Sequence, residues 1–158
     1  MKRKCEQCTA CCQGALTLEV PTVHFSDGRG CKFLYGDGIR CSIHETRPQE
    51  CKDFECQWLR DSDDLHDDMR PDKSGVILLQ NRYMWNGYCI DLATPVALEA
   101  PEQTIAHLFE RSKRKQKPLI VNRYVVTEGV KERFIEPFGP TGFAEYVVNS
   151  ASQGVDFL

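Results

Sequence analysis

The chain has 158 residues, a formal net charge of −3 and 41% hydrophobic residues. This length suits one ordinary domain with a core, and the slightly acidic balance argues against nucleic acid and against an anionic membrane surface as partners. No stretch is long and apolar enough to span a bilayer. The basic start, Met1–Lys4, is followed at once by cysteines rather than by an apolar signal segment, which favours a cytoplasmic location.

The outlying feature of the composition is its nine cysteines, eight of which lie before residue 57. These eight are Cys5, Cys8, Cys11, Cys12, Cys31, Cys41, Cys51 and Cys56. Such a density is typical either of secreted proteins stapled by disulfides or of intracellular proteins that bind metal. Because the start of the chain does not resemble a signal peptide, we expect reduced cysteines that bind metal.

The first four cysteines follow the spacing of a metal knuckle, in which a tight turn lets two thiolates reach one ion. Cys5 and Cys8 have this spacing, and so do Cys8 and Cys11. Consecutive side chains of an extended backbone point to opposite sides. We therefore expect Cys11 and Cys12 to serve two different metals, or opposite sides of one cluster.

The segment from Cys41 to Cys56 predicts how the later cysteines are presented. Pro48 is expected to open a short helix that carries Cys51. Five residues along a continuous helix change the direction by about 140°, so Cys51 and Cys56 can share a metal easily only if the helix ends between them. We interpret His44 as a hydrogen-bonding or partly exposed side chain rather than as a ninth ligand.

Eight thiolates suffice for two closed tetrahedral zinc sites of four cysteines each. The two sites would carry a formal charge of about −4, which the nearby Lys32, Arg40, Arg47 and Lys52 could offset. An iron–sulfur cluster is the competing interpretation. The chain departs from the bacterial ferredoxin run, because Cys12 directly follows Cys11 and no proline comes next. Spacing alone leaves open a cluster that uses the distant cysteines.

Composition divides the chain near residue 60. Residues 1–60 lack long apolar runs and predict a small cysteine-rich lobe stapled by metal. Residues 61–158 predict an α+β lobe with antiparallel strands and one or two helices, packed with the first lobe as one compact unit. Residues 61–73 are acidic, which indicates a solvated connecting segment.

The α+β part predicts its elements in order. Residues 75–94 predict two strands joined by a turn at Asn86-Gly87. Residues 101–116 predict a helix with Pro101 in its first turn, and its basic end suits a helix C-terminus better than a nucleic-acid site. Strands are expected within residues 118–128 and 132–139, and a short helix within 142–152. Cys89 is expected to be a core thiol.

The cysteine motifs together resemble one family. The motifs are the run from Cys5 to Cys12, CKFL at Cys31, CSIHETRPQEC from Cys41 to Cys51, and FECQW ending at Trp58. They resemble the CxxCxxCC cysteine-cluster family of zinc- or iron-chelating domain proteins, over about residues 5–58. The resemblance implies metal binding by the clustered cysteines. A flagellin lysine methylase with a similar cysteine pattern is associated with an iron–sulfur cluster.

We therefore expect a protein that holds zinc in two structural sites through its clustered cysteines. The chain contains no P-loop, dinucleotide fingerprint, His-Glu-x2-His or nucleophile–base set, which argues against an enzyme. The alternative is an iron–sulfur protein with a redox role, or with a role in protein modification such as lysine methylation. A protein partner is compatible with either function. A third hypothesis is metal handling, in which a labile site donates or stores zinc or iron and loses it rapidly to a mild chelator.

Overall fold

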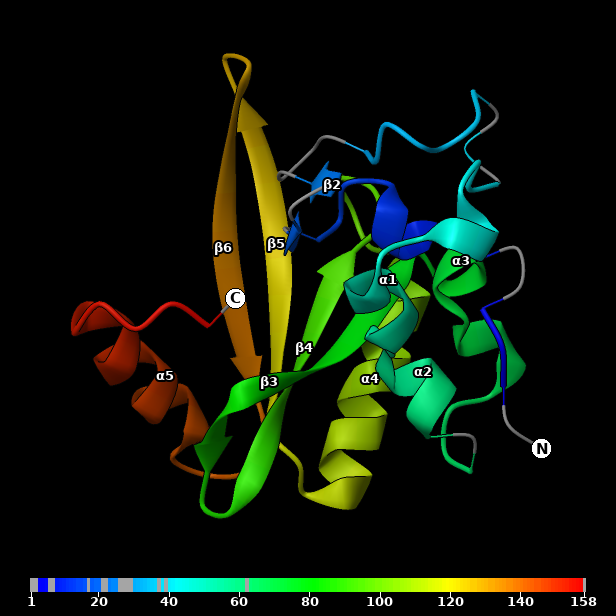
Figure 1. The fold of residues 1–158 in the computed structure, drawn as a ribbon. Coiled ribbons are helices and arrows are strands. Elements are labelled where there is room, and N and C mark those ends of the chain that lie inside the picture. Colours follow the sequence, from blue (N-terminus) through cyan, green and yellow to red (C-terminus); the bar gives the residue numbers. More distant parts are fainter. Residues whose placement is uncertain are drawn as a thin grey trace.

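The fold is α+β, as predicted (Figure 1). The computed structural model describes residues 3–5, 8–16, 18–20, 23–25, 30–36, 38, 40–61 and 63–157. Within this part of the chain, no helix is both long and apolar enough to cross a membrane.

The elements described before residue 75 are short. They are the 3-10 turns η1 (Ala10–Cys12), η2 (His44–Thr46) and η3 (Asp67–Met69), the strands β1 (Leu18–Val20) and β2 (Val23–Phe25), and the helices α1 (Gln49–Asp53), α2 (Gln57–Arg60) and α3 (Pro71–Ser74). The acidic segment that was expected to be a solvated connection contains two of them, η3 and α3. The strands β1 and β2 form an antiparallel pair of their own that the sequence did not predict.

The second part of the chain contains the longer elements. They are the strands β3 (Val76–Trp85), β4 (Tyr88–Pro95), β5 (Leu119–Thr127) and β6 (Val130–Phe138), and the helices α4 (Glu102–Lys115) and α5 (Phe143–Ser152). The predicted strands and helices are confirmed at these places, with Pro101 at the N-cap of α4 rather than within its first turn. Basic residues fill the last turn of α4, as expected.

The four long strands form one sheet in the order β3-β4-β5-β6. The expectation of antiparallel strands holds for β3 with β4 and for β5 with β6, but it was wrong for β4 with β5, which are parallel. The reason is the connection, because α4 carries the chain back to the starting end of the sheet. The β5–β6 hairpin extends well beyond the strands beside it (Figure 1).

Both hairpin turns in this sheet use left-handed backbone. Asn86 and Gly87 have φ values of 48° and 79°, which is the geometry of the predicted Asn-Gly turn. Glu128 and Gly129 repeat it at the tip of the β5–β6 hairpin, with φ values of 52° and 79°. At each of these turns the chain therefore reverses its direction within two residues.

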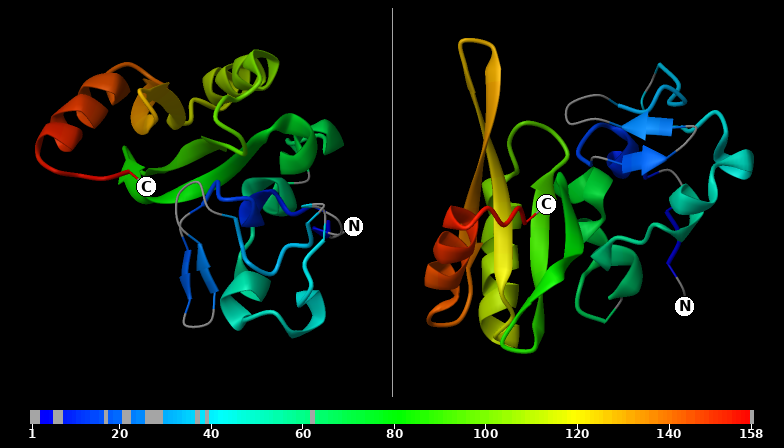
Figure 2. Two further views of the ribbon diagram at one scale, coloured as in Figure 1. Left: turned by 90° about the horizontal axis from the view of Figure 1, so that it is seen from above. Right: turned by 60° about the vertical axis from the view of Figure 1, so that its left-hand side comes forward.

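The sheet separates two cores. Leu119 and Val121 belong to a core with α4, whereas Ile120 between them belongs to a core with α5. The first core also contains Cys56 and Trp58 from the cysteine-rich part of the chain. Figure 2 shows the cysteine-rich part and α5 at opposite sides of the sheet. The cysteines are therefore presented on the α4 side.

Candidate metal centre

All nine cysteines lie in the described part of the chain, and none of them forms a disulfide there. Cys31 and Cys56 are buried, with 8% and 6% of their surface exposed, and the others are half-buried. Cys89 is only half-buried in β4, although a core thiol was expected there. The eight clustered cysteines fall into two sets according to their neighbours.

The inner cysteines are Cys5, Cys8, Cys11 and Cys56. A turn brings the first two together, since the amide of Cys8 donates to the carbonyl of Cys5 at 2.7 Å. Cys8 and Cys11 pack against the same core as Cys56. Burial, and then the charges of Cys56 and Cys8, raise the pKa of the Cys5 thiol to about 11. The four thiols are therefore close enough for the charge on one thiolate to shift the pKa of its neighbours.

The outer cysteines are Cys12, Cys31, Cys41 and Cys51. The amide of Cys31 donates to the carbonyl of Cys12 at 2.7 Å, and a single β-bridge joins Cys41 to Leu34. Burial, and then the charges of the other three outer cysteines, raise the pKa of Cys51. This set includes cysteines from three separate stretches of the chain.

Cys11 and Cys12 are where the two sets meet. Both lie in the 3-10 turn η1 rather than in extended backbone, so consecutive side chains differ by about 120° and not by a half-turn. Their sulfurs are 3.8 Å apart. This contact raises the pKa of Cys11 and lowers that of Cys12, although burial opposes the second shift. Cys11 thus contacts Cys12, while the other cysteines whose charge acts on it are Cys5 and Cys8 of the inner set.

Backbone amides donate to several of the sulfurs. Burial raises the pKa of Cys8, of Cys31 and of Cys56, and the amide two residues further along the chain donates to each sulfur and opposes this shift. The distance from the amide nitrogen of Phe33 to Sγ of Cys31 is 3.4 Å. Hydrogen bonds of this kind stabilise the thiolate, which is the form that binds metal. The turns around the cysteines therefore offset part of the effect by which burial disfavours the thiolate.

Helix α1 presents Cys51, with Pro48 at its N-cap as predicted. The helix ends at Asp53, which is the condition under which Cys51 and Cys56 could share a metal. They nevertheless have different neighbours, because the chain leaves α1 through Phe54 in an extended conformation. The segment between the two cysteines connects the outer set to the inner set.

Arg47 lies within reach of both sets. Its charge lowers the pKa of Cys12 and of Cys5, after the larger effects of hydrogen bonding and burial. Its Nη1 atom donates to the carbonyl of His44 at 3.0 Å, which holds the side chain in place. His44 itself is half exposed and has its ring nitrogen 3.4 Å from Glu45. Arg47 is thus placed to offset thiolate charge, as expected for one of the nearby cations.

Within the described residues, no three Cys, His, Asp or Glu side chains converge as they would around a bound ion. The chemistry of each set fits a tetrahedral zinc ion, because each offers four sulfurs. In such an ion the sulfurs are about 3.8 Å apart, from Zn–S bonds of about 2.3 Å. Within either set, side chains would have to turn toward a common point for zinc to bind.

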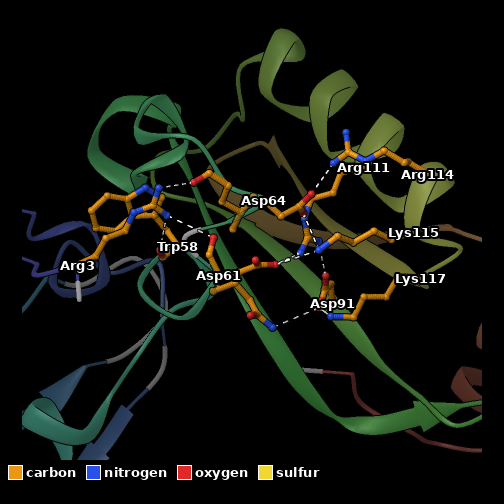
Figure 3. Close-up of polar contacts among 11 residues, drawn as sticks. Arg3, Trp58, Asp61, Asp64, Asp91, Arg111, Arg114, Lys115 and Lys117 are labelled. Carbon is orange, nitrogen blue, oxygen red and sulfur yellow. Dashed lines mark hydrogen bonds and ion pairs between the residues drawn. The ribbon is translucent and has the colours of Figure 1, made fainter. Parts of the chain in front are cut away.

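A buried arginine fastens the cysteine-rich part to the sheet, and the sequence analysis missed it. Arg111 of α4 is 4% exposed and is bound by three carboxylates (Figure 3). Its Nη1 atom lies 2.7 Å from Asp91 of β4, and its Nη2 atom lies 3.0 Å from Asp61. Its Nε donates to Asp64. Asp61 and Asp64 belong to the segment that was expected to be solvated.

The same segment is bound at its other side by Arg3. The guanidinium of Arg3 lies 4.6 Å from the centre of the Trp58 ring and donates to the carbonyls of Trp58 and Leu65 (Figure 3). Because α2 begins directly after Cys56, both arginines hold the backbone that presents an inner cysteine. The signal in the sequence was charge complementarity, with two aspartates three residues apart and a basic helix end 50 residues later.

Comparison of the chain with models of protein families, with curated proteins and with solved structures gives no match.

Proposed function

We propose that this protein binds two zinc ions, one through the inner cysteines and one through the outer cysteines. The observation that carries the proposal is that eight buried or half-buried thiols, none of them in a disulfide among the described residues, gather around the turns that join Cys5 to Cys8 and Cys12 to Cys31. Their division into two sets of four is part of the proposal. Four sulfurs complete a tetrahedral zinc site and leave no position open for a substrate. The proposal is therefore a structural metal-binding function without catalysis at the metal.

The chain supplies what such sites need besides sulfur. Amides donate to the sulfurs of Cys8, Cys31 and Cys56, and Arg47 brings a positive charge to both sets. These groups offset part of the formal charge of about −2 that four thiolates leave on each zinc site. The resemblance of residues 5–58 to a metal-chelating family supports the same function.

Zinc would supply cross-links that the cysteine-rich part otherwise lacks. Structural zinc contributes about 10–16 kcal/mol in small peptides, which equals the whole stability of many domains, about 5–15 kcal/mol. The described elements before residue 75 are too short to stabilise themselves. Metal binding and the ordering of the turns that carry the cysteines should therefore be coupled.

An iron–sulfur protein is the second candidate, and the contact between Cys11 and Cys12 favours it. Their sulfurs, 3.8 Å apart, join the two sets into one continuous group of thiols. Such a group could surround a polynuclear cluster. A redox role, or a role in protein modification such as lysine methylation, would follow from that.

The test is to purify the protein without oxygen and to measure metals, acid-labile sulfide and visible absorbance together. We expect about two zinc ions per chain, from four sulfurs per ion, with no sulfide and no colour. Cys89→Ser is the control, because Cys89 belongs to neither set, and it should keep the full zinc content. Iron with sulfide and a brown colour would overturn the zinc proposal in favour of the cluster.

A further inference from the structure

The inner and outer cysteines have unequal surroundings. The inner cysteine Cys56 is 6% exposed and lies in the main core with Trp58, Val76 and Val121. Arg3 and Arg111 hold the backbone around it. Freeing Cys56 from its site would therefore disturb the core that supports the sheet.

The outer cysteines lie against a much smaller cluster. Cys31 is its one buried member among the described residues, and Cys12, Phe33 and Leu34 are the half-buried ones. The hydrogen bonds of this stretch are mainly local, such as the amide of Ser42 to the carbonyl of Phe33 at 2.7 Å. Opening the outer set would therefore expose little apolar surface.

The side chains around the outer cysteines face solvent. Exposed residues flank Cys41 and Cys51 on both sides in the chain, and they are Arg40, Ser42, Glu50 and Lys52. Segments with few buried contacts open locally at low free energy, whereas core segments open only with the whole molecule. Each set has one buried and three half-buried cysteines, so the difference lies in opening: the outer site should open to a dissolved chelator at a lower free energy than the inner site, which is tied to the main core.

We infer that the inner site releases its zinc slowly, while the outer site exchanges zinc rapidly with chelators in solution without unfolding of the sheet. This inference depends on the proposed function, because it assigns different roles to its two sites. The outer site would make residues 30–36 and 40–53 a part of the chain whose order depends on free zinc. The inner site would keep residues 54–61 and 63–75 docked on the sheet in either state.

The test is the transfer of zinc from the intact protein to an excess of the colorimetric chelator 4-(2-pyridylazo)resorcinol. We expect half of the zinc to leave in a fast phase and half in a slow phase. Their rates should differ at least about tenfold, for which a difference of about 1.4 kcal/mol in activation free energy suffices. Cys41→Ser should remove the fast phase and keep the slow one, and Cys89→Ser should keep both.

Hydrogen exchange supplies a second measurement that needs no variant. After removal of the fast-released zinc, amides of residues 40–53 should lose protection, while those of residues 76–95 keep theirs. A single phase that carries all the zinc, or loss of both ions in Cys41→Ser, would overturn the inference and leave the proposed function standing. A purified protein without zinc would overturn both.

Discussion

Replacing Arg111 by methionine tests whether the buried arginine is what holds the cysteine-rich part against the sheet. Methionine keeps much of the volume of the side chain but binds none of the three carboxylates. Asp91 would remain 2% exposed, with Lys117 as its remaining ion-pair partner among the described residues. Removal of one partner from a buried ion pair leaves an uncompensated charge and costs about 3–5 kcal/mol.

The measurement is urea unfolding of the metal-loaded protein at neutral pH. With a slope of about 2 kcal/mol per molar urea, the expected loss lowers the midpoint by about 1.5–2.5 M. Arg114→Met is the matched control. Arg114 pairs with Asp64 from the same helix, but its side chain is 63% exposed, and exposed pairs contribute about 0–1 kcal/mol.

A second substitution, at Asp91, should restore part of the stability that Arg111→Met loses. Asp91→Asn in the Arg111→Met background removes the buried charge that Lys117 would by then offset without Arg111, so the two substitutions should couple by about 0.5–3 kcal/mol. Zinc content should stay unchanged in each variant, because no cysteine is altered. If Arg111→Met cost no more than Arg114→Met, the buried network would not be what stabilises the docked segment.

Three further outcomes follow. Burial raises the pKa values of Asp61 and Asp64, but hydrogen bonds from Arg111 and Lys115 together outweigh it and lower them. The stabilisation that these two carboxylates contribute is present above about pH 4 and is lost below it. The urea midpoints of wild type and of the variant with both Asp61→Asn and Asp64→Asn should therefore converge on acidification. Gly75→Ala should lower the thermal unfolding midpoint more than Gly87→Ala does. Both glycines have left-handed φ, but only at position 75 would the added methyl group meet a ring carbon of Pro101, at 2.8 Å. Equal losses of stability would exclude that contact. Arg3→Ala should lower stability by about 1–2 kcal/mol through lost hydrogen bonds and ring stacking, and Arg3→Lys by less; an unchanged urea midpoint would contradict this.

The sequence predicted the elements of the second half because their signals are local. Asn-Gly determines a two-residue reversal through its tolerance of left-handed backbone, and the apolar spacing of residues 102–115 determines a helix with one buried face. The parallel pairing of β4 with β5 was missed, since pairing depends on where a crossover helix returns the chain. That is decided by packing against the sheet and not by the strands themselves.

Around the cysteines, the sequence determined the kind of chemistry and the number of donors. Eight thiols with knuckle spacing favour metal, and that follows from residue type alone. Which cysteines are neighbours was decided by the tertiary structure. Cys51 and Cys56 are five residues apart yet belong to different sets, while Cys56 lies with Cys5 across most of the cysteine-rich part.

The buried ion pairs of Arg111 also could not be predicted from the sequence. From sequence, Asp61 and Asp64 are two members of an acidic stretch with every reason to remain in water. Only the docking of that stretch on α4 and β4 brings them to Arg111, 50 and 47 residues away. Local sequence determines turns, helices and ligand chemistry because these depend on near neighbours, whereas the burial and pairing of charges depend on which distant segments meet, and that is a property of the whole fold.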